Sequence, residues 1–272
     1  MRSFVISVAM ILLIASASTA AAEREQLLDF IVAQGYVVGP DVGVLANDAG
    51  YRNDAIDALV TEADATGKTI RTGDWVVLPS SLCRIQPPRV RSEIRIDDAD
   101  VETMTSTKDA YAEFGGRGCI LDGSGLVERV RKTRGWDAEQ ASTQYLRFLA
   151  ENLRTGDLAF YGTDALSSPA GFQVLKGGCA DLPEVEAIRH SQALRDREFD
   201  ALIREDAANI VCGRDSSPSH LIREIIEKRT GGTDTNAWMP FEMTFMAIGA
   251  GWYAGTGATQ KGTPRPPLCH FE

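Results

Sequence analysis

Two stretches of this chain nearly repeat each other, and their spacing constrains the fold more than any other feature of the sequence. Residues 70–78 read IRTGDWVVL, and residues 153–161 read LRTGDLAFY. At the same offset, QGYVV at 34–38 corresponds to RGCIL at 117–121, with glycine on glycine and apolar residues on apolar residues. Self-similarity at one offset is typical of repeated structural units. The sequence therefore predicts two copies of one small module.

The apolar pattern of the first copy predicts the order of its elements. Leu27, Phe30 and Ile31 have the i, i+3, i+4 spacing of one helix face. A short apolar run at 36–38 follows Gly35 and predicts a strand, and two further helical stripes precede residues 69–79. Those residues, TIRTGDWVVLP, are two β-prone runs around a Gly-Asp turn. We therefore expect helix, strand, helix, helix and hairpin, with RTGD as the turn of the closing hairpin in each copy.

This order of elements over residues 24–80 resembles a winged helix, in which the third helix reads DNA and the hairpin forms the wing. A fainter third copy is indicated by LVERVRKTRG at 126–135 and LIREIIEKRTG at 221–231. The resemblance implies a helix-rich α+β fold with two or three tandem winged-helix-like modules, each with a short two-stranded hairpin. The expected boundaries are a signal peptide at 1–22, module one at 23–85, module two at 104–165, a connector at 166–182, a long helix with a third module at 183–256, and a Pro-rich tail at 257–272.

The charge pattern argues against DNA as a partner. The third helix of module one carries Asp54, Asp57, Glu62 and Asp64 and no Lys or Arg, and the chain has 28 basic against 38 acidic residues. Contacts with phosphate supply most nucleic-acid affinity, so an acidic reading helix would be repelled. We expect no nucleic-acid partner. Module two has a basic run, which is either a solvated helix face or a contact for an anionic partner: Arg129, Arg131, Lys132 and Arg134.

A second resemblance covers the strand, helix, helix, strand portion of module one, which ends in GDWVVLP. It is similar to a LysM cell-wall module, although the opening strand lacks the Gly-Asp-Thr step of that family and copy two lacks the terminal Pro. This resemblance implies binding to peptidoglycan glycans. An exposed Trp75 on the hairpin would favour it, because sugar rings stack on aromatic faces.

The N-terminus predicts export. Met1 and Arg2 supply a positive start, an apolar run extends from Phe4 to Ile14, and residues 20–22 are alanines. This pattern is typical of a secretory signal peptide cleaved near Ala22. We expect a periplasmic or secreted protein with no transmembrane segment in the mature chain, since no later apolar stretch is long enough.

Cysteines of an exported chain are expected to pair. Cys83 and Cys179 follow the two predicted hairpins, and Cys119 and Cys212 lie in the next opening strands. Similar spacings of 36 and 33 residues favour the bridges Cys83–Cys119 and Cys179–Cys212, with Cys269 unpaired; the alternative is that the spacing is coincidental. A zinc site is disfavoured, because the chain has three His and no Cys-x-x-Cys.

No catalytic signature is present in the sequence. A Gly-x-Ser-x-Gly elbow, His-Glu-x-x-His and a phosphate loop are all missing. The Gly-rich stretch 118–130 could hold an anion at a helix start, but Asp122 or Ser124 as a helix cap explains it as well. We expect no cofactor and a non-catalytic envelope protein that acts as a protein-interaction adaptor. The alternatives are a peptidoglycan-binding protein with LysM-like modules and a hydrolase of unrecognised type. The oligomeric state does not follow from the sequence.

Overall fold

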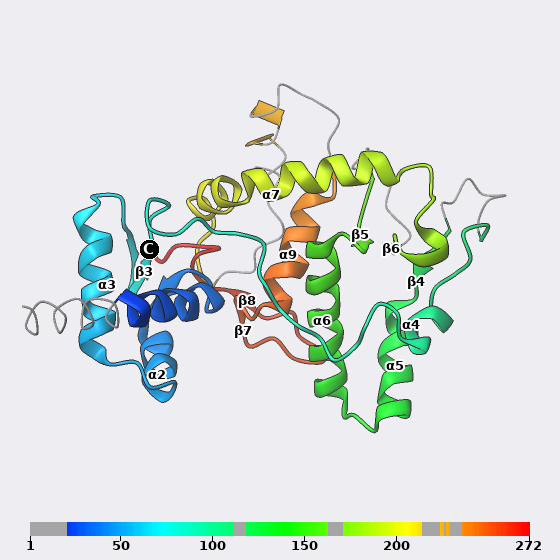
Figure 1. The fold of residues 1–272 in the computed structure, drawn as a ribbon, viewed down its shortest axis with the longest axis horizontal. Helices are drawn as coiled ribbons and strands as arrows, with labels where there is room; N and C mark the ends of the chain where they lie inside the picture. The colour runs from blue at the N-terminus through cyan, green and yellow to red at the C-terminus, as the bar shows by residue number, and fades with distance from the viewer. Residues whose placement is uncertain (1–20, 111–117, 163–170, 214–223, 226, 229–235) are drawn as a thin grey trace, which may run out of the picture. The chain divides into compact units, whose positions relative to one another are not determined.

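The fold consists of two compact units, which Figure 1 shows in a computed structural model. Unit 1 comprises residues 1–84 and unit 2 residues 85–272. Both units are helix-rich and contain small antiparallel sheets, so the predicted α+β class is confirmed. The second predicted module, the connector, the long helix and the tail all belong to unit 2. The structure describes residues 21–110, 118–162, 171–213, 224–225, 227–228 and 236–272.

In its described residues, 21–84, unit 1 is a three-stranded sheet with three helices. The sheet order is β1-β3-β2, with antiparallel neighbours. Apolar side chains from the first helix, α2, α3 and the sheet form one core, in which Leu27, Ile31 and Leu78 are almost fully buried. The elements are a helix at 21–33, β1 (Val37–Val38), α2 (Pro40–Asp48), α3 (Asn53–Ala65), β2 (Ile70–Thr72) and β3 (Trp75–Val77).

Unit 2 contains a second three-stranded sheet, a two-stranded sheet and the longer helices. Helix α6 lies along α9, as Figure 1 shows, and Phe148 and Met246 are buried there. The first elements are α4 (Ala99–Thr103), β4 (Ile120–Leu121), α5 (Gly123–Arg134), α6 (Ala138–Thr155), β5 (Leu158–Ala159) and β6 (Phe172–Val174). The later ones are the 3-10 helix η2 (Gly177–Cys179), α7 (Val185–Ala207), α9 (Met239–Gly249), β7 (Tyr253–Ala254) and β8 (Thr263–Pro264).

The three-stranded sheets of the two units have the same topology. The order β4-β6-β5 corresponds to β1-β3-β2, and both sheets are antiparallel throughout. In unit 1, the amide of Leu78 donates to the carbonyl of Tyr36 at 3.0 Å. In unit 2, the amide of Val174 donates to the carbonyl of Cys119 at 2.9 Å. Each first strand is therefore extended at its start by the same kind of backbone bond.

The backbone just before these two strands is also alike. Gly35 has φ 95° and Tyr36 has φ 65°, while Gly118 has φ 67° and Cys119 has φ 53°. Positive φ is uncommon for residues other than glycine. Tyr36 and Cys119 are the only such residues in the part of the chain that the structure describes. The matched stretches QGYVV and RGCIL thus adopt the same local conformation.

The RTGD match does not describe equivalent positions, so that expectation is wrong for the second copy. In unit 1, Gly73 and Asp74 form the turn between β2 and β3. In unit 2, Thr155 ends α6, and Gly156 is its C-cap with φ 78°. The structural counterpart of Gly156 is Gly67, which follows α3 with φ 65°. Glycine suits a hairpin turn and a helix C-cap for the same reason, its tolerance of positive φ, so sequence identity alone could not separate the two.

Both predicted disulfides are wrong. Cys119 pairs with Cys179 at a Cα–Cα distance of 6.0 Å, and Cys212 pairs with Cys269 at 5.1 Å. The first bridge forms because β4 and β6 are neighbours and η2, directly after β6, carries Cys179 back to the start of β4. The second forms because the tail pairs with the chain after α7, where Cys212 N donates to His270 O at 2.7 Å. Cys83 belongs to neither bridge.

Some predicted features lie outside the described residues. They include the signal peptide up to residue 20 and, within the third predicted module, residues 214–223, 226 and 229–235. Within the described part of the chain, no helix is long and apolar enough to cross a membrane.

Candidate binding site

The predicted basic run on α5 is neutralised by acidic neighbours in unit 2. Arg129 and Arg134 join α5 to the segment around α4, and Arg134 also lies 5.0 Å from the ring centroid of Trp136. Arg131 and Lys132 both pair with one glutamate on their own helix. These side chains therefore have partners inside unit 2. The pairs are Arg129–Asp100 at 2.7 Å, Arg134–Asp98 at 2.5 Å, Arg131–Glu128 at 3.1 Å and Lys132–Glu128 at 3.2 Å.

Trp75 is partly buried in β3 and packs on the core of unit 1. Its ring lies against the backbone of Gly39, where a β-carbon would come within 2.4 Å of the ring. The glycine that precedes α2 is thus required by the indole, and the contact occupies part of the aromatic surface.

Unit 2 has two neighbouring hollows, which border the α6–α9 pair. Leu146 of α6 and Ile248 of α9 line both. The helices approach closely beside this shared wall, since a β-carbon on Gly249 would lie 2.4 Å from the carbonyl oxygen of Leu146. A short residue at the end of α9 therefore brings the two helices together between the hollows.

The larger hollow, here called the apolar groove, lies between α5, α6, α9 and residues 257–261 and has a volume of about 730 Å³. Its surface is mostly apolar, and polar residues such as Ser124, Gln260 and Lys261 also line it. Phe241 is 36% exposed. The apolar and aromatic residues of the groove are Val127, Tyr145, Leu146, Phe241, Phe245, Ile248 and Ala258.

The smaller hollow, here called the basic hollow, has a volume of about 510 Å³ and surrounds the glycine-rich turn after α9. Arg91 and Arg147 line it, and both are exposed. In the described residues, neither guanidinium is paired with a carboxylate. Thr143 and Tyr253 also line this hollow. It therefore presents two guanidiniums that form no ion pair within the described residues.

Two tyrosines of the hollows stay protonated at neutral pH. Burial raises the pKa of the Tyr145 phenol, and the negative charge of Asp122 adds to this effect. Its hydroxyl lies against the start of α5, where a β-carbon on Gly123 would be 2.0 Å away. Burial likewise raises the pKa of Tyr253 to about 12, against a hydrogen bond with Thr244 that lowers it. Both can act as hydrogen-bond donors, and neither is poised as a base.

Helix α5 begins at the side of the apolar groove, with Asp122 as its cap. Asp122 accepts a hydrogen bond from the amide of Gly125 at 2.8 Å, and Ser124 Oγ donates to the same carboxylate at 2.9 Å. These bonds lower the pKa of Asp122. The capping interpretation of the Gly-rich stretch is thus what the contacts show.

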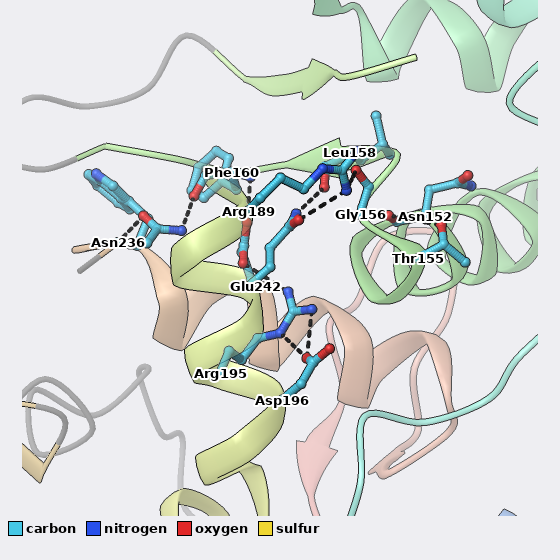
Figure 2. A network of polar contacts seen from close by, with 12 residues as sticks. Asn152, Thr155, Gly156, Leu158, Phe160, Arg189, Arg195, Asp196, Asn236 and Glu242 are labelled. Atoms are coloured by element: carbon cyan, nitrogen blue, oxygen red, sulfur yellow. Dashed lines mark hydrogen bonds and ion pairs between the residues drawn. The ribbon is translucent and has the colours of Figure 1, made fainter. Parts of the chain in front are cut away.

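A buried polar network in unit 2 holds the free edge of β5 and is shown in Figure 2. Carbonyls on alternate residues of this edge accept hydrogen bonds from side chains of α7 and from Asn236. Side chains also accept from the amides of this edge. An unpaired strand edge is a site for unwanted strand pairing, and these side chains occupy it. The bonds are Arg189 to Gly156 O at 2.5 Å, Gln192 to Leu158 O at 3.2 Å, Phe160 N to Glu242 at 2.8 Å, Asn236 to Phe160 O at 3.1 Å and Gly162 N to Asn236 at 3.2 Å.

The most strongly buried charges belong to this network. Arg195 and Glu242 are 0% and 2% exposed and pair at 3.1 Å. Burial raises the pKa of Glu242, against the opposing effect of Arg195. Arg195 also pairs with Asp196 at 2.9 Å. Neither member of the Arg195–Glu242 pair lines a hollow, so the pair supports the fold of unit 2.

The hollows contain few charged side chains among their described lining residues. The one carboxylate among the described lining residues is Glu128, which pairs with Arg131 and Lys132. Within the described ranges, no three His, Cys, Asp or Glu side chains are grouped so that they could hold a metal ion. Comparisons with protein-family models, with curated proteins and with solved structures found no match.

Sequence reasoning did not find Arg91 and Arg147. Arg91 belongs to a basic stretch, RVRSEIR at 89–95, whose charge stands out in an acidic chain and could have been noticed. Arg147 follows two residues that face the apolar groove, and nothing in its neighbourhood marks it. Their meeting in one hollow depends on the packing of residues 90–93 against α6, which no spacing rule reveals.

Proposed function

We propose that this protein is a non-catalytic adaptor that binds a protein partner through the apolar groove. The groove itself carries the proposal. It is lined mainly by apolar and aromatic residues with polar residues among them, which resembles the composition of a protein–protein interface. Partly exposed Phe241 adds an aromatic contact of the kind that dominates binding energy. The occupant is an apolar side chain of a partner polypeptide.

The compartment of this adaptor is proposed to be periplasmic or extracellular. Two disulfides fit an oxidising environment. The N-terminal pattern of a short basic start, an apolar run and Ala20–Ala22 supports cleavage of a signal peptide near Ala22.

Unit 1 and the part of unit 2 that contains β4, α5, α6, β5 and β6 are proposed to be two winged-helix-like modules that repeat one plan. The shared sheet order, the shared bond at the first strand and the paired positive-φ positions support this. In unit 2, the helix that would correspond to a DNA reader is α6, and it is packed along α9. This packing, together with the acidic α3 of unit 1, supports a module used for protein contacts rather than for nucleic acid.

The test is a selection of displayed random peptides against the mature chain. Peptides that bind the groove should lose about tenfold in affinity when Phe241→Ala removes its ring, because an aromatic contact of this kind contributes about 1–2 kcal/mol. Val44→Ala is the matched control, since Val44 is 61% exposed and lies in unit 1. Failure to enrich any peptide, or equal binding to both variants, would contradict the proposal.

The same preparation distinguishes the alternatives. Co-sedimentation with purified peptidoglycan sacculi, reduced when Trp75 is replaced by Leu in a folded variant, would favour the LysM-like interpretation. Hydrolysis of an ester, peptide or glycoside substrate would favour a hydrolase, provided that the activity co-purifies with the protein.

A further inference from the structure

We infer that the basic hollow binds a carboxylate of the partner, so that the protein recognises an apolar anchor with an acidic group beside it. This inference rests on the proposed function and adds the chemistry of the partner. The starting observation is a contrast within unit 2. The four cations on α5 each have an acidic partner, whereas Arg91 and Arg147 have none in the described part of the chain.

The unpaired charges are not explained by the overall balance of the chain. The protein carries a formal net charge of −10, so carboxylates outnumber cations. Glu151, four residues after Arg147 on α6, accepts the amide of Ser92 at 2.9 Å, and no ion pair joins it to Arg91 or Arg147 in the described residues. Two exposed guanidiniums that line one hollow and form no ion pair are therefore available to a ligand. A planar guanidinium matches a carboxylate with two parallel hydrogen bonds, which makes Arg the suited residue for such recognition.

The position of the hollow couples it to the apolar groove. Leu146 and Ile248 line both, and three successive residues of α6 divide between them: Tyr145 in the groove, Leu146 in the shared wall and Arg147 in the hollow. Successive helical residues turn by about 100°, so Tyr145 and Arg147 project on different sides of the wall that Leu146 and Ile248 form. A peptide that crosses this shared wall would place an apolar side chain in the groove and a carboxylate in the hollow.

The other polar groups of the hollow leave the two arginines as the main candidates for binding an anion. Around the glycine-rich turn, the amide of Ala250 donates to Met246 O and that of Gly251 donates to Ile248 O. Those amides are already used and cannot form an anion site. Thr143 lines the hollow and is exposed, so its hydroxyl can add one hydrogen bond. Recognition thus depends mainly on Arg91 and Arg147.

The experiment compares one groove-binding peptide from the selection with its twins. In one twin, each Asp or Glu is replaced by Asn or Gln, and in another the C-terminus is amidated. These twins separate a side-chain carboxylate from a terminal one. Binding is measured to the mature chain, to Arg91→Gln/Arg147→Gln and to Arg89→Gln. Arg89 is the matched control, because it is exposed in the same segment but does not line the hollow.

We expect binding to weaken about tenfold or more when the carboxylate is removed from the peptide. We expect a similar loss when Arg91→Gln/Arg147→Gln removes the two guanidiniums from the protein. The two changes should not add, and Arg89→Gln should bind as the unsubstituted chain does. If Phe241→Ala weakens binding while the carboxylate twins bind equally, the inference is overturned and the proposed function stands.

A second probe keeps the inference testable if no peptide is selected. Octanoate and octan-1-ol differ only in the carboxylate and are titrated against the same variants. Octanoate binding that exceeds octanol binding and is lost in Arg91→Gln/Arg147→Gln supports the carboxylate site. Together with an empty peptide selection, this result would mean that the protein-adaptor proposal failed. Equal or absent binding of both probes, together with an empty selection, overturns both.

Discussion

A single residue, Glu242, satisfies two demands in the interior of unit 2. One oxygen accepts the amide of Phe160 on the edge of β5, and the other pairs with Arg195. Removal of one partner of a buried ion pair leaves a charge without compensation, whereas removal of both does not. Replacing one member of the pair should therefore cost more stability than replacing both.

We predict that Glu242→Ala lowers the free energy of unfolding by about 3–5 kcal/mol, because Arg195 would remain buried with only the exposed carboxylate of Asp196 as its ionic partner. Arg195→Met/Glu242→Leu should cost less than the sum of its two single substitutions. Chemical denaturation of the four proteins in a double-mutant cycle measures this. Additive effects would show that the two charges do not interact.

The cap of α5 gives a pH-dependent prediction at the same scale. Hydrogen bonds from Gly125 N and Ser124 Oγ lower the pKa of Asp122 below its ordinary value of 3.8. A lowered pKa means that the stabilisation is present above pH 3.8 and is lost as the pH falls through the folded-state value.

Asp122→Ala should therefore destabilise the protein by about 1 kcal/mol at neutral pH, as loss of an N-cap does. The difference from the unsubstituted chain should shrink below about pH 4. Asp122→Asn keeps a capping oxygen that does not titrate, so the contribution of the cap to stability should change little with pH in this variant. Denaturation curves between pH 3 and 7 check this, and a gap that widens in acid would contradict it.

Among the elements, the α6–α9 contact depends on a glycine, and α2 offers the matched control. A β-carbon on Gly249 would meet backbone and Ala150 Cβ, at 2.4 and 2.6 Å, whereas one on Gly43 meets nothing within 4 Å. We predict that Gly249→Ala destabilises by about 1–3 kcal/mol through overpacking. Gly43→Ala should stabilise by up to about 1 kcal/mol through helix propensity. Thermal and urea unfolding of both variants decide it; equal effects would contradict the close approach.

The sequence predicted elements better than it predicted their partners. Helices and short strands followed from apolar spacing because that spacing is a local property, as at Leu27 and Ile31. The prediction that Gly156 lies in a hairpin turn was wrong, because a hairpin turn and a helix C-cap both favour glycine. The groove and the hollow were not predicted, because Arg91 and Arg147 are brought together only by long-range packing.

For the whole molecule, the covalent connections are the clearest prediction. Non-reducing peptide mapping should give Cys119–Cys179 and Cys212–Cys269, with Cys83 in neither. Loops of 60 and 57 residues imply about 4 kcal/mol for each bridge on the chain-entropy account. Replacing either pair with alanine should destabilise unit 2 by about this amount, and Cys83→Ala should not. A dominant Cys83–Cys119 peptide would contradict the structure.

Unit 1 is predicted to fold without unit 2, since its core is formed by its own helices and sheet. Residues 23–84, expressed alone, should show helical circular dichroism and a cooperative thermal transition that reductant does not change. An unfolded fragment would show that the core of unit 1 needs the rest of the chain.

The two bridges have a consequence for proteolysis. Every wall of the apolar groove lies inside one of two covalent rings, 119–179 and 212–269. A protease that cuts once inside either ring opens the backbone and releases no fragment, so nicked protein would run intact until it is reduced. The rings are joined through residues 180–211, most of which form α7. In a compartment rich in proteases, α7 is therefore the segment whose cleavage would break the covalent link between the two sides of the apolar groove.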